Sequence, residues 1–159
     1  MKSNLTAMQG FKATVLGSVV EAPLSIVVPF TTPELTKAAL EHAATLSAGL
    51  NATIRLIDAH VVPVQCPLSE PPVNREFQVN RMREITEEAG MPVQVEIIYT
   101  RDRMECFRRK VDAGSLIVVA TGAAGIPWWP TAQEKLARSL LSAGYEVVLV
   151  PRPQARGLR

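Results

Sequence analysis

The residues best suited to ligand chemistry lie between positions 115 and 134, in the run SLIVVATGAAGIPWWPTAQE. Gly122 and Gly125 follow an apolar segment of strand length, and Thr131 precedes a helical pattern. A strand that ends in glycines just before a helix N-terminus exposes backbone N–H groups that bind a phosphate or another anion. Thr121, Gly122, Gly125 and Thr131 are therefore the candidate anion-binding residues of this segment.

The two glycines also fit a tight turn that binds no ligand, because glycine tolerates backbone angles that other residues avoid. An anion site is favoured by Thr32 and Thr131, which stand where two helical patterns begin, so that each hydroxyl caps a helix N-terminus. The dipole at such an end attracts negative charge. Glu134 would lie close to the anion and argues against a triphosphate. Both interpretations stay open at this point.

Acid–base chemistry has one candidate pair, Asp58 and His60. Alternate residues of a strand share a face, so both side chains lie on the same side of a sheet. No nucleophile stands near them in the sequence, and His42, on the apolar face of a predicted helix, is typical of a structural histidine. Cys66 and Cys106 are far apart and form no metal-ligand motif. The sequence assigns no catalytic residue and no metal site, which favours a protein that is not an enzyme.

The composition fits a single α/β domain. Of 159 residues, 47% are apolar and only 5% are aromatic, so the expected core consists of Val, Ile, Leu and Ala, as in parallel sheets flanked by helices. The net charge is +2, and its excess is concentrated in residues 152–159, a basic tail that we interpret as solvated. No nucleic-acid or membrane partner is therefore expected. No apolar run approaches the roughly 18 residues that span a bilayer, and we expect a cytoplasmic protein with reduced thiols.

Hydrophobic periodicity predicts five strands that alternate with four helices, after an N-terminal extension of residues 1–23. Right-handed crossovers then require a parallel sheet with helices on both faces. For this sheet we expect the Rossmann-like strand order 3-2-1-4-5, which the crossovers alone do not fix. In that order the crevice beyond strands 1 and 4 is the expected binding site. Leu50 and Phe77 are expected to pack in the core. The predicted strands are 24–30, 52–62, 93–100, 115–121 and 145–151, and the predicted helices are 32–49, 74–90, 102–114 and 131–144.

Residues 24–151 resemble the universal stress protein family, a five-stranded α/β fold of adenine-nucleotide binders and their non-binding relatives. The resemblance depends on the run IVVP before the first helix, the strand exit at 59–63, the run LIVVATGAAG and a last strand VVLVP. It implies ATP or AMP as the ligand. The binding residues that it implies are Pro29, Phe30, Thr31, Ala59, Thr121, Gly122, Gly125 and Thr131.

The phosphate-binding signature of this family is only half present. Its pattern is G-x2-G-x9-G-[ST], and Gly122 and Gly125 match the first two glycines. At the spacing of the final pair this chain has Lys135-Leu136, and counting back from the last strand places Gln133-Glu134 there instead. Neither pair supplies a glycine followed by a hydroxyl, so the resemblance implies a degenerate nucleotide-binding motif.

The family's V-P-x-D pattern, which holds ribose or a metal, is also altered. The matching run ends in Thr31, so that a hydroxyl replaces the carboxylate. Trp128 and Trp129 occupy the loop that would fold over phosphates, where two rings and the flanking prolines leave fewer backbone donors. The two rings either pack in the core or within the loop, or form an exposed apolar patch for a protein partner or a planar ligand.

The resemblance implies a binding or regulatory module of the stress response, with weak, altered or absent adenine-nucleotide binding. It also implies a homodimer that pairs through the last strand, Glu146 to Val150, which would otherwise be an exposed apolar edge. Two other functions stay open. One is a nucleotide-hydrolysing enzyme of the same broad fold that uses Asp58 and His60, and the other is a protein-interaction domain without a ligand.

Overall fold

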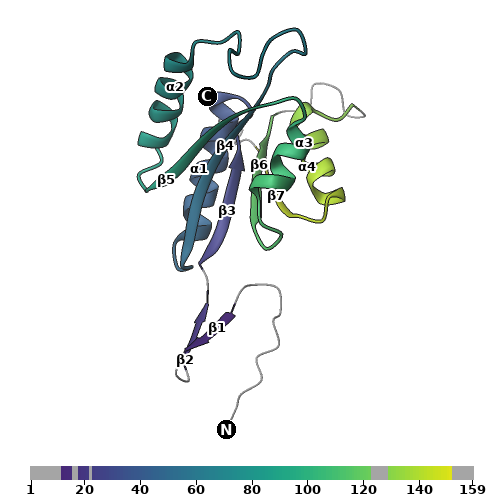
Figure 1. Cartoon of the computed structure of the whole chain (residues 1–159). Coiled ribbons are helices and arrows are strands. Elements are labelled where there is room, and N and C mark those ends of the chain that lie inside the picture. The colour runs from purple at the N-terminus through teal and green to yellow at the C-terminus, as the bar shows by residue number, and fades with distance from the viewer. Residues whose placement is uncertain (1–11, 16–17, 22, 123–128, 152–159) are drawn as a thin grey trace.

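The structure, a computed structural model, describes residues 12–15, 18–21, 23–122 and 129–151 (Figure 1). The basic tail at 152–159, Gly125 and Trp128 lie outside the described residues. Every predicted strand and helix has a counterpart among the described residues. The elements are β1 (Lys12–Val15), β2 (Ser18–Glu21), β3 (Leu24–Pro29), α1 (Pro33–Ser47), β4 (Ala52–Val61), α2 (Arg75–Glu87), β5 (Val93–Thr100), α3 (Arg103–Lys110), β6 (Leu116–Thr121), α4 (Ala132–Ser142) and β7 (Glu146–Pro151).

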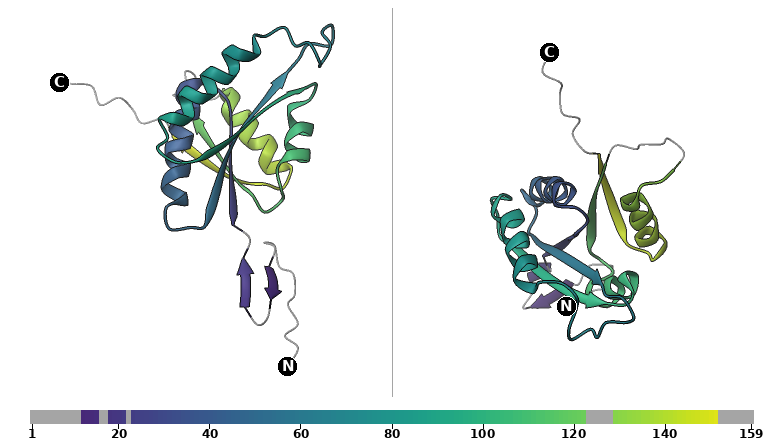
Figure 2. Two further views of the ribbon diagram at one scale, coloured as in Figure 1. Left: turned by 60° about the vertical axis from the view of Figure 1, so that its left-hand side comes forward. Right: turned by 90° about the horizontal axis from the view of Figure 1, so that it is seen from above.

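Parallel strands form the main sheet in the order β5-β4-β3-β6-β7. Because β3 comes first among them in the chain, this is the predicted order 3-2-1-4-5, and the α/β fold class is confirmed. The register pairs Pro29 with Ile57 across β3 and β4, and Ile26 with Leu116 across β3 and β6. α1 and α2 pack on one face of the sheet, and α3 and α4 pack on the other (Figure 2).

The core has one hydrophobic cluster on each face of the sheet, because successive side chains of a strand point to opposite faces. In β3, Ile26 and Val28 face α1 and α2, whereas Val27 faces α3 and α4. Both clusters are mainly aliphatic, as the composition predicts. Among the described residues, Phe107 of α3 is the largest fully buried side chain. The Tyr145 hydroxyl donates to the carbonyl of Phe107 at 3.3 Å, which joins the end of α4 to α3.

Two expected core contacts are wrong. α1 ends at Ser47, so Leu50 falls in the following turn and its side chain is 53% exposed. Phe77 of α2 is 63% exposed, because the buried stripe of that helix is Gln78, Met82 and Ile85. The sequence prediction gave the aromatic ring at position 77 priority over the glutamine that follows it.

Residues before the main sheet form a separate antiparallel hairpin of β1 and β2, in which Lys12 pairs with Glu21. Figure 1 places it beyond the amino-terminal end of β3, which is the end opposite to the predicted ligand site. Among the helices of the described ranges, none combines the length and the apolar character that crossing a membrane requires.

Candidate functional site

The candidate site lies where β3 and β6 end, because the chain leaves these two neighbouring strands toward opposite faces of the sheet. β3 continues into α1 on one face, and the segment after β6 leads to α4 on the other. Pairing between the two strands is recorded for Ile26 with Leu116 and for Val27 with Ile117. The carboxyl-terminal residues Pro29 and Thr121 lie beyond these pairs, so the strand ends flank the predicted crevice.

Threonine hydroxyls accept hydrogen bonds from backbone N–H groups of the turn after β3. The Thr31 N–H donates to Oγ1 of Thr36 at 3.1 Å, and Thr36 is fully buried. The Leu35 N–H donates to Oγ1 of Thr32 at 3.3 Å, which is the predicted N-cap of α1. The Phe30 N–H donates to the carbonyl of Ile57 in β4 at 2.8 Å. These N–H groups are therefore already bonded within the protein.

The start of α4 carries its own negative charge. The Glu134 N–H donates to Oγ1 of Thr131 at 3.2 Å, and the Thr131 N–H donates to Oε2 of Glu134 at 3.0 Å. This is the predicted capping box, and it is confirmed. A carboxylate at a helix N-terminus is stabilised by the helix dipole, just as a bound anion would be. The Glu134 side chain thus fills part of the role that a ligand phosphate has at such a helix.

The structure brings some predicted site residues together and leaves others apart. Thr121 and Gly122 end β6 and, like Phe30 and Thr31, are partly buried. Ala59 lies in β4 but is buried under α3, in the cluster on the far face from α1. Gly125 lies outside the described residues. The chain is described again from Trp129 onward, and the side chain of Trp129 is 66% exposed, with its ring centroid 5.6 Å from Nζ of Lys135.

Asp58 is the most unusual polar residue near this end of the sheet. Its side chain is 5% exposed, and Oδ2 has no hydrogen-bond partner among the described residues. Burial raises the pKa of Asp58, and the nearby charges of His60, Arg81 and Arg103 oppose that shift. The register places Asp58 one residue beyond Ile57, the partner of Pro29, so this carboxyl lies beside the turn after β3.

A hydrogen-bonded chain of three side chains lies on the same face of the sheet. The Tyr99 hydroxyl donates to Oε1 of Gln78 at 2.7 Å, which turns the Gln78 amide nitrogen toward Nδ1 of His60 at 3.3 Å. In this arrangement Nδ1 of His60 accepts a hydrogen bond from the Gln78 amide, which corresponds to the tautomer with its proton on Nε2. Gln78 is 3% exposed. Sequence reasoning found Asp58 and His60 on one face but missed Gln78 and Tyr99.

One signal in the sequence would have revealed Gln78. It stands four residues before Met82 and seven before Ile85, which is the spacing of an apolar helix stripe, and a polar residue at such a position needs a buried partner. Cavities of about 460, 260 and 550 Å³ are lined by described residues, and neither Asp58 nor His60 lines any of these three. Within the described ranges, no group of three His, Cys, Asp or Glu side chains could hold a metal.

No protein-family profile and no curated protein matches this sequence. Solved structures match its fold. A universal stress protein in complex with cAMP gives a TM-score of 0.54 at 15% identity, over 81% of this chain and 97% of its own. A universal stress protein from Archaeoglobus fulgidus gives 0.56 at 14% identity, over 80% and 98%. A structural-genomics protein whose biochemical function was assigned from its structure gives 0.53 at 16% identity, over 83% and 98%. Identities this low establish the fold alone, and that fold is the α/β fold of the universal stress proteins.

Proposed function

We propose that this chain is a universal-stress-protein-like module with a binding or regulatory role in a stress response, acting in the cytoplasm. We place its ligand site beyond the carboxyl-terminal ends of β3 and β6, next to Pro29, Phe30, Thr31, Thr121 and Gly122, none of which lines the three cavities described above. A structural relative in complex with cAMP supports an adenine nucleotide as the class of ligand. We further propose that ATP and AMP bind weakly or not at all.

The observation that carries this proposal is the capping box of α4. Glu134 accepts the Thr131 N–H at 3.0 Å, so a carboxylate already neutralises the helix end that would otherwise attract phosphate. A phosphate placed there meets a like charge. The turn after β3 adds to this effect, because Thr31 has no carboxylate for ribose hydroxyls and its N–H is bonded to Thr36.

Isothermal titration with ATP and AMP tests the proposal. We expect the wild-type dissociation constant to be weaker than roughly 100 μM. Glu134→Gln keeps an oxygen that caps the helix and removes the charge, so ATP affinity should rise about fivefold, the effect of ~1 kcal/mol of relieved repulsion. Glu41→Gln, at an exposed position of α1, is the control and should leave the affinity unchanged. Micromolar ATP binding by the wild type contradicts the proposal.

We also propose a homodimer that pairs through β7. This strand pairs with β6 on one side, and Leu149 is 46% exposed at the edge of the main sheet. Burying an apolar edge strand against a second copy removes it from water and pairs its backbone groups. Leu149→Lys should convert the dimer to a monomer in sedimentation equilibrium, whereas Leu141→Lys, equally exposed on α4, should not.

An interaction domain without a nucleotide is the second candidate, supported by the exposed ring of Trp129 beside Lys135. A planar apolar ring next to a cation suits a protein partner, and Trp128 belongs to the same expected surface. Mass spectrometry of small molecules released on denaturation tests this candidate, because a co-purified nucleotide excludes it. Nucleotide hydrolysis that survives in Asp58→Asn/His60→Gln excludes an enzyme that uses this pair.

A further inference from the structure

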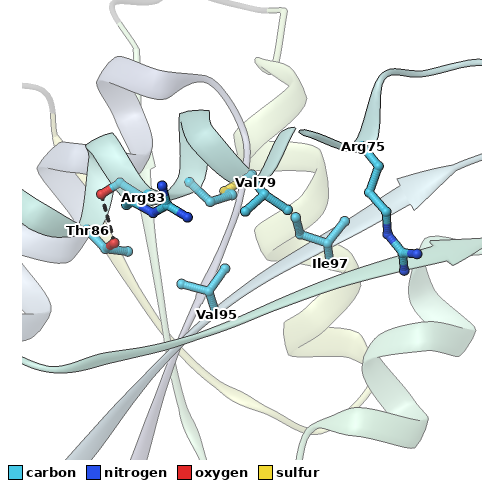
Figure 3. A pocket seen from close by; sticks show the side chains of 7 residues that line it. Arg75, Val79, Arg83, Thr86, Val95 and Ile97 are labelled. Atoms are coloured by element: carbon cyan, nitrogen blue, oxygen red, sulfur yellow. Dashed lines mark hydrogen bonds between the residues drawn. The ribbon is translucent and has the colours of Figure 1, made fainter. Parts of the chain in front are cut away.

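A groove of about 460 Å³ lies between α2 and β5, at the edge of the sheet opposite to β7 (Figure 3). Its walls are side chains from one side of α2 and from the α2-facing side of β5. Figure 3 shows Val79, Val95 and Ile97 grouped at its centre, with Arg75 toward one end and Arg83 toward the other. The groove is therefore apolar in the middle and cationic at both ends.

The apolar centre of this groove is incompletely covered by the protein itself. Val79 is 40% exposed and Val95 is 39% exposed. The cause is the placement of α2, because Met82 and Ile85 pack in one cluster with α1 and Gln78 bonds to Tyr99 and His60, which leaves Val79 at the margin of the helix. Two half-exposed valines that face each other across a groove gain stability when a third side chain is buried between them.

The strand that borders the groove lacks the usual protection of a sheet edge. β5 has eight residues, VQVEIIYT, with neither proline nor lysine. The charged residue of β5, Glu96, is neutralised within the protein, because its Oε1 accepts a hydrogen bond from Nε of Arg55 at 3.0 Å. Among the described strands β5 pairs only with β4, so the backbone groups on its other side remain available to a further strand.

The charge of the groove selects the partner. Arg75 and Arg83 line it and no acidic residue does. Neither arginine forms an ion pair within the described part of the chain, and the Arg75 guanidinium carbon lies 5.9 Å from the centroid of the Tyr99 ring. Two arginines at an interface favour carboxylates, which they bind through paired hydrogen bonds.

The spacing of the arginines sets the spacing of the acids. Eight positions separate Arg75 from Arg83, which is a rise of about 12 Å along a helix at 1.5 Å per residue. In an extended strand, side chains on one face recur every two residues, so residues i and i+4 lie about 13 Å apart. The residue i+2 between them then lies opposite Val79.

We propose that this groove binds an extended acidic segment of a partner protein, which adds to β5 as an extra strand. The segment has the pattern acidic-x-apolar-x-acidic. Its two carboxylates bind Arg75 and Arg83, and its apolar side chain fills the space between Val79 and Val95. This surface is distinct from the crevice beyond β3 and β6, so the two sites can be tested independently.

Fluorescence anisotropy with a labelled nine-residue peptide, centred on Glu-Thr-Ile-Thr-Glu, tests the proposal. We expect saturable binding to the full chain that is at least about tenfold tighter than that of the same peptide with Gln for Glu, which corresponds to ~1.4 kcal/mol. The double variant Arg75→Glu/Arg83→Glu should lose this binding. Arg108→Glu, at an exposed position of α3 on the other face of the sheet, should retain the peptide binding.

A charge-reversed peptide keeps the test decisive if the double variant loses stability. A peptide with Lys for both Glu residues should bind Arg75→Glu/Arg83→Glu more tightly than the wild type, and circular dichroism should show an unchanged fold. Equal binding of all three peptides to the wild type overturns the proposal. So does a wild-type dimer that Val95→Lys dissociates without any peptide binding, because the groove is then covered by a second copy.

Discussion

The guanidinium carbon of Arg81 lies 4.6 Å from the centroid of the Phe30 ring, so α2 contacts the turn that follows β3. The same guanidinium lies 5.8 Å from the ring of Phe77. Arg81 Nε is buried and has no hydrogen-bond partner among the described residues, so the aromatic faces contribute favourable contacts to this cation, in addition to the nearby Asp58 carboxyl. Phe30, a predicted ligand contact, is thus already engaged by a cation of the protein.

A double-mutant cycle should measure this contact. Arg81→Met and Phe30→Leu, made singly and together, should show a coupling of about 1 kcal/mol in urea unfolding, because each single change removes the same cation–π interaction. Arg81→Met combined with Phe107→Leu is the control, and these changes should be additive, since Phe107 packs on the opposite face of the sheet. Additivity in the first cycle would mean that ring and cation are neighbours without interaction.

Replacement of Asp58 should stabilise the fold at neutral pH. Burial raises the pKa of this carboxyl above its ordinary value of 3.8, so the folded chain holds the proton more tightly than the unfolded chain. The contribution of Asp58 to stability is complete below pH 3.8 and is lost as pH rises through the raised pKa. Asp58→Asn should therefore gain about 1 kcal/mol over the wild type at pH 7, as expected for a buried unsatisfied group.

The comparison needs urea unfolding of both proteins between pH 4 and pH 7. The advantage of Asp58→Asn should shrink toward pH 4, while Asp112→Asn, on an exposed site, should follow the wild type throughout. A loss of stability in Asp58→Asn at pH 7 would show instead that Arg81 and His60 hold the carboxylate in its charged form.

The capping box of α4 should contribute measurable stability. Thr131→Ala removes the acceptor for the Glu134 N–H and should cost about 1 kcal/mol, whereas Thr131→Ser keeps the hydroxyl and should cost only a few tenths. Chemical unfolding followed by circular dichroism measures both. An equal loss of stability in both variants would show that the methyl group of Thr131, and not its capping hydroxyl, stabilises the helix.

The hydrogen bond between Tyr99 and Gln78 should contribute measurably to the free energy of unfolding. Tyr99→Phe removes the hydroxyl that donates to buried Gln78 at 2.7 Å, and it should cost about 1 kcal/mol because an amide oxygen is left without a partner. Adding Gln78→Met should recover part of that loss, since both polar groups are then gone. A further loss of stability in the double variant would contradict this account.

Local patterns were sufficient to predict the strands and helices, whereas the strand order 3-2-1-4-5 was an expectation that they did not fix. The aliphatic run of β6 and the alternation of β5 mark strands directly, and the hydroxyl caps at Thr32 and Thr131 mark helix starts, because each signal acts over a few residues. The wrong contacts, Leu50 and Phe77, depend on where a helix stops and how it is rotated. Tertiary packing decides both of these features.

The chemistry of the site was less accessible, since it depends on contacts between distant residues. Asp58 and His60 were placed on one face correctly, but the sequence does not show that Tyr99 and Gln78 join His60, or that Arg81 stacks on Phe30. Likewise, the sequence predicted the capping box that contains Glu134, but it did not predict the hydrogen bond from the Thr31 N–H to Thr36.

The short pairing between β3 and β6 makes α1 the element that unites the domain. Two recorded residue pairs join these strands, whereas Leu35, Ala39 and Leu40 of α1 pack in one cluster with Ile26 of β3 and Val118 of β6. The helix thereby ties the halves of the sheet into one cooperative unit. Hydrogen exchange should give one common opening free energy for the hydrogen-bonded amides of β4 and of β7, and Leu40→Ala should let the two halves open separately.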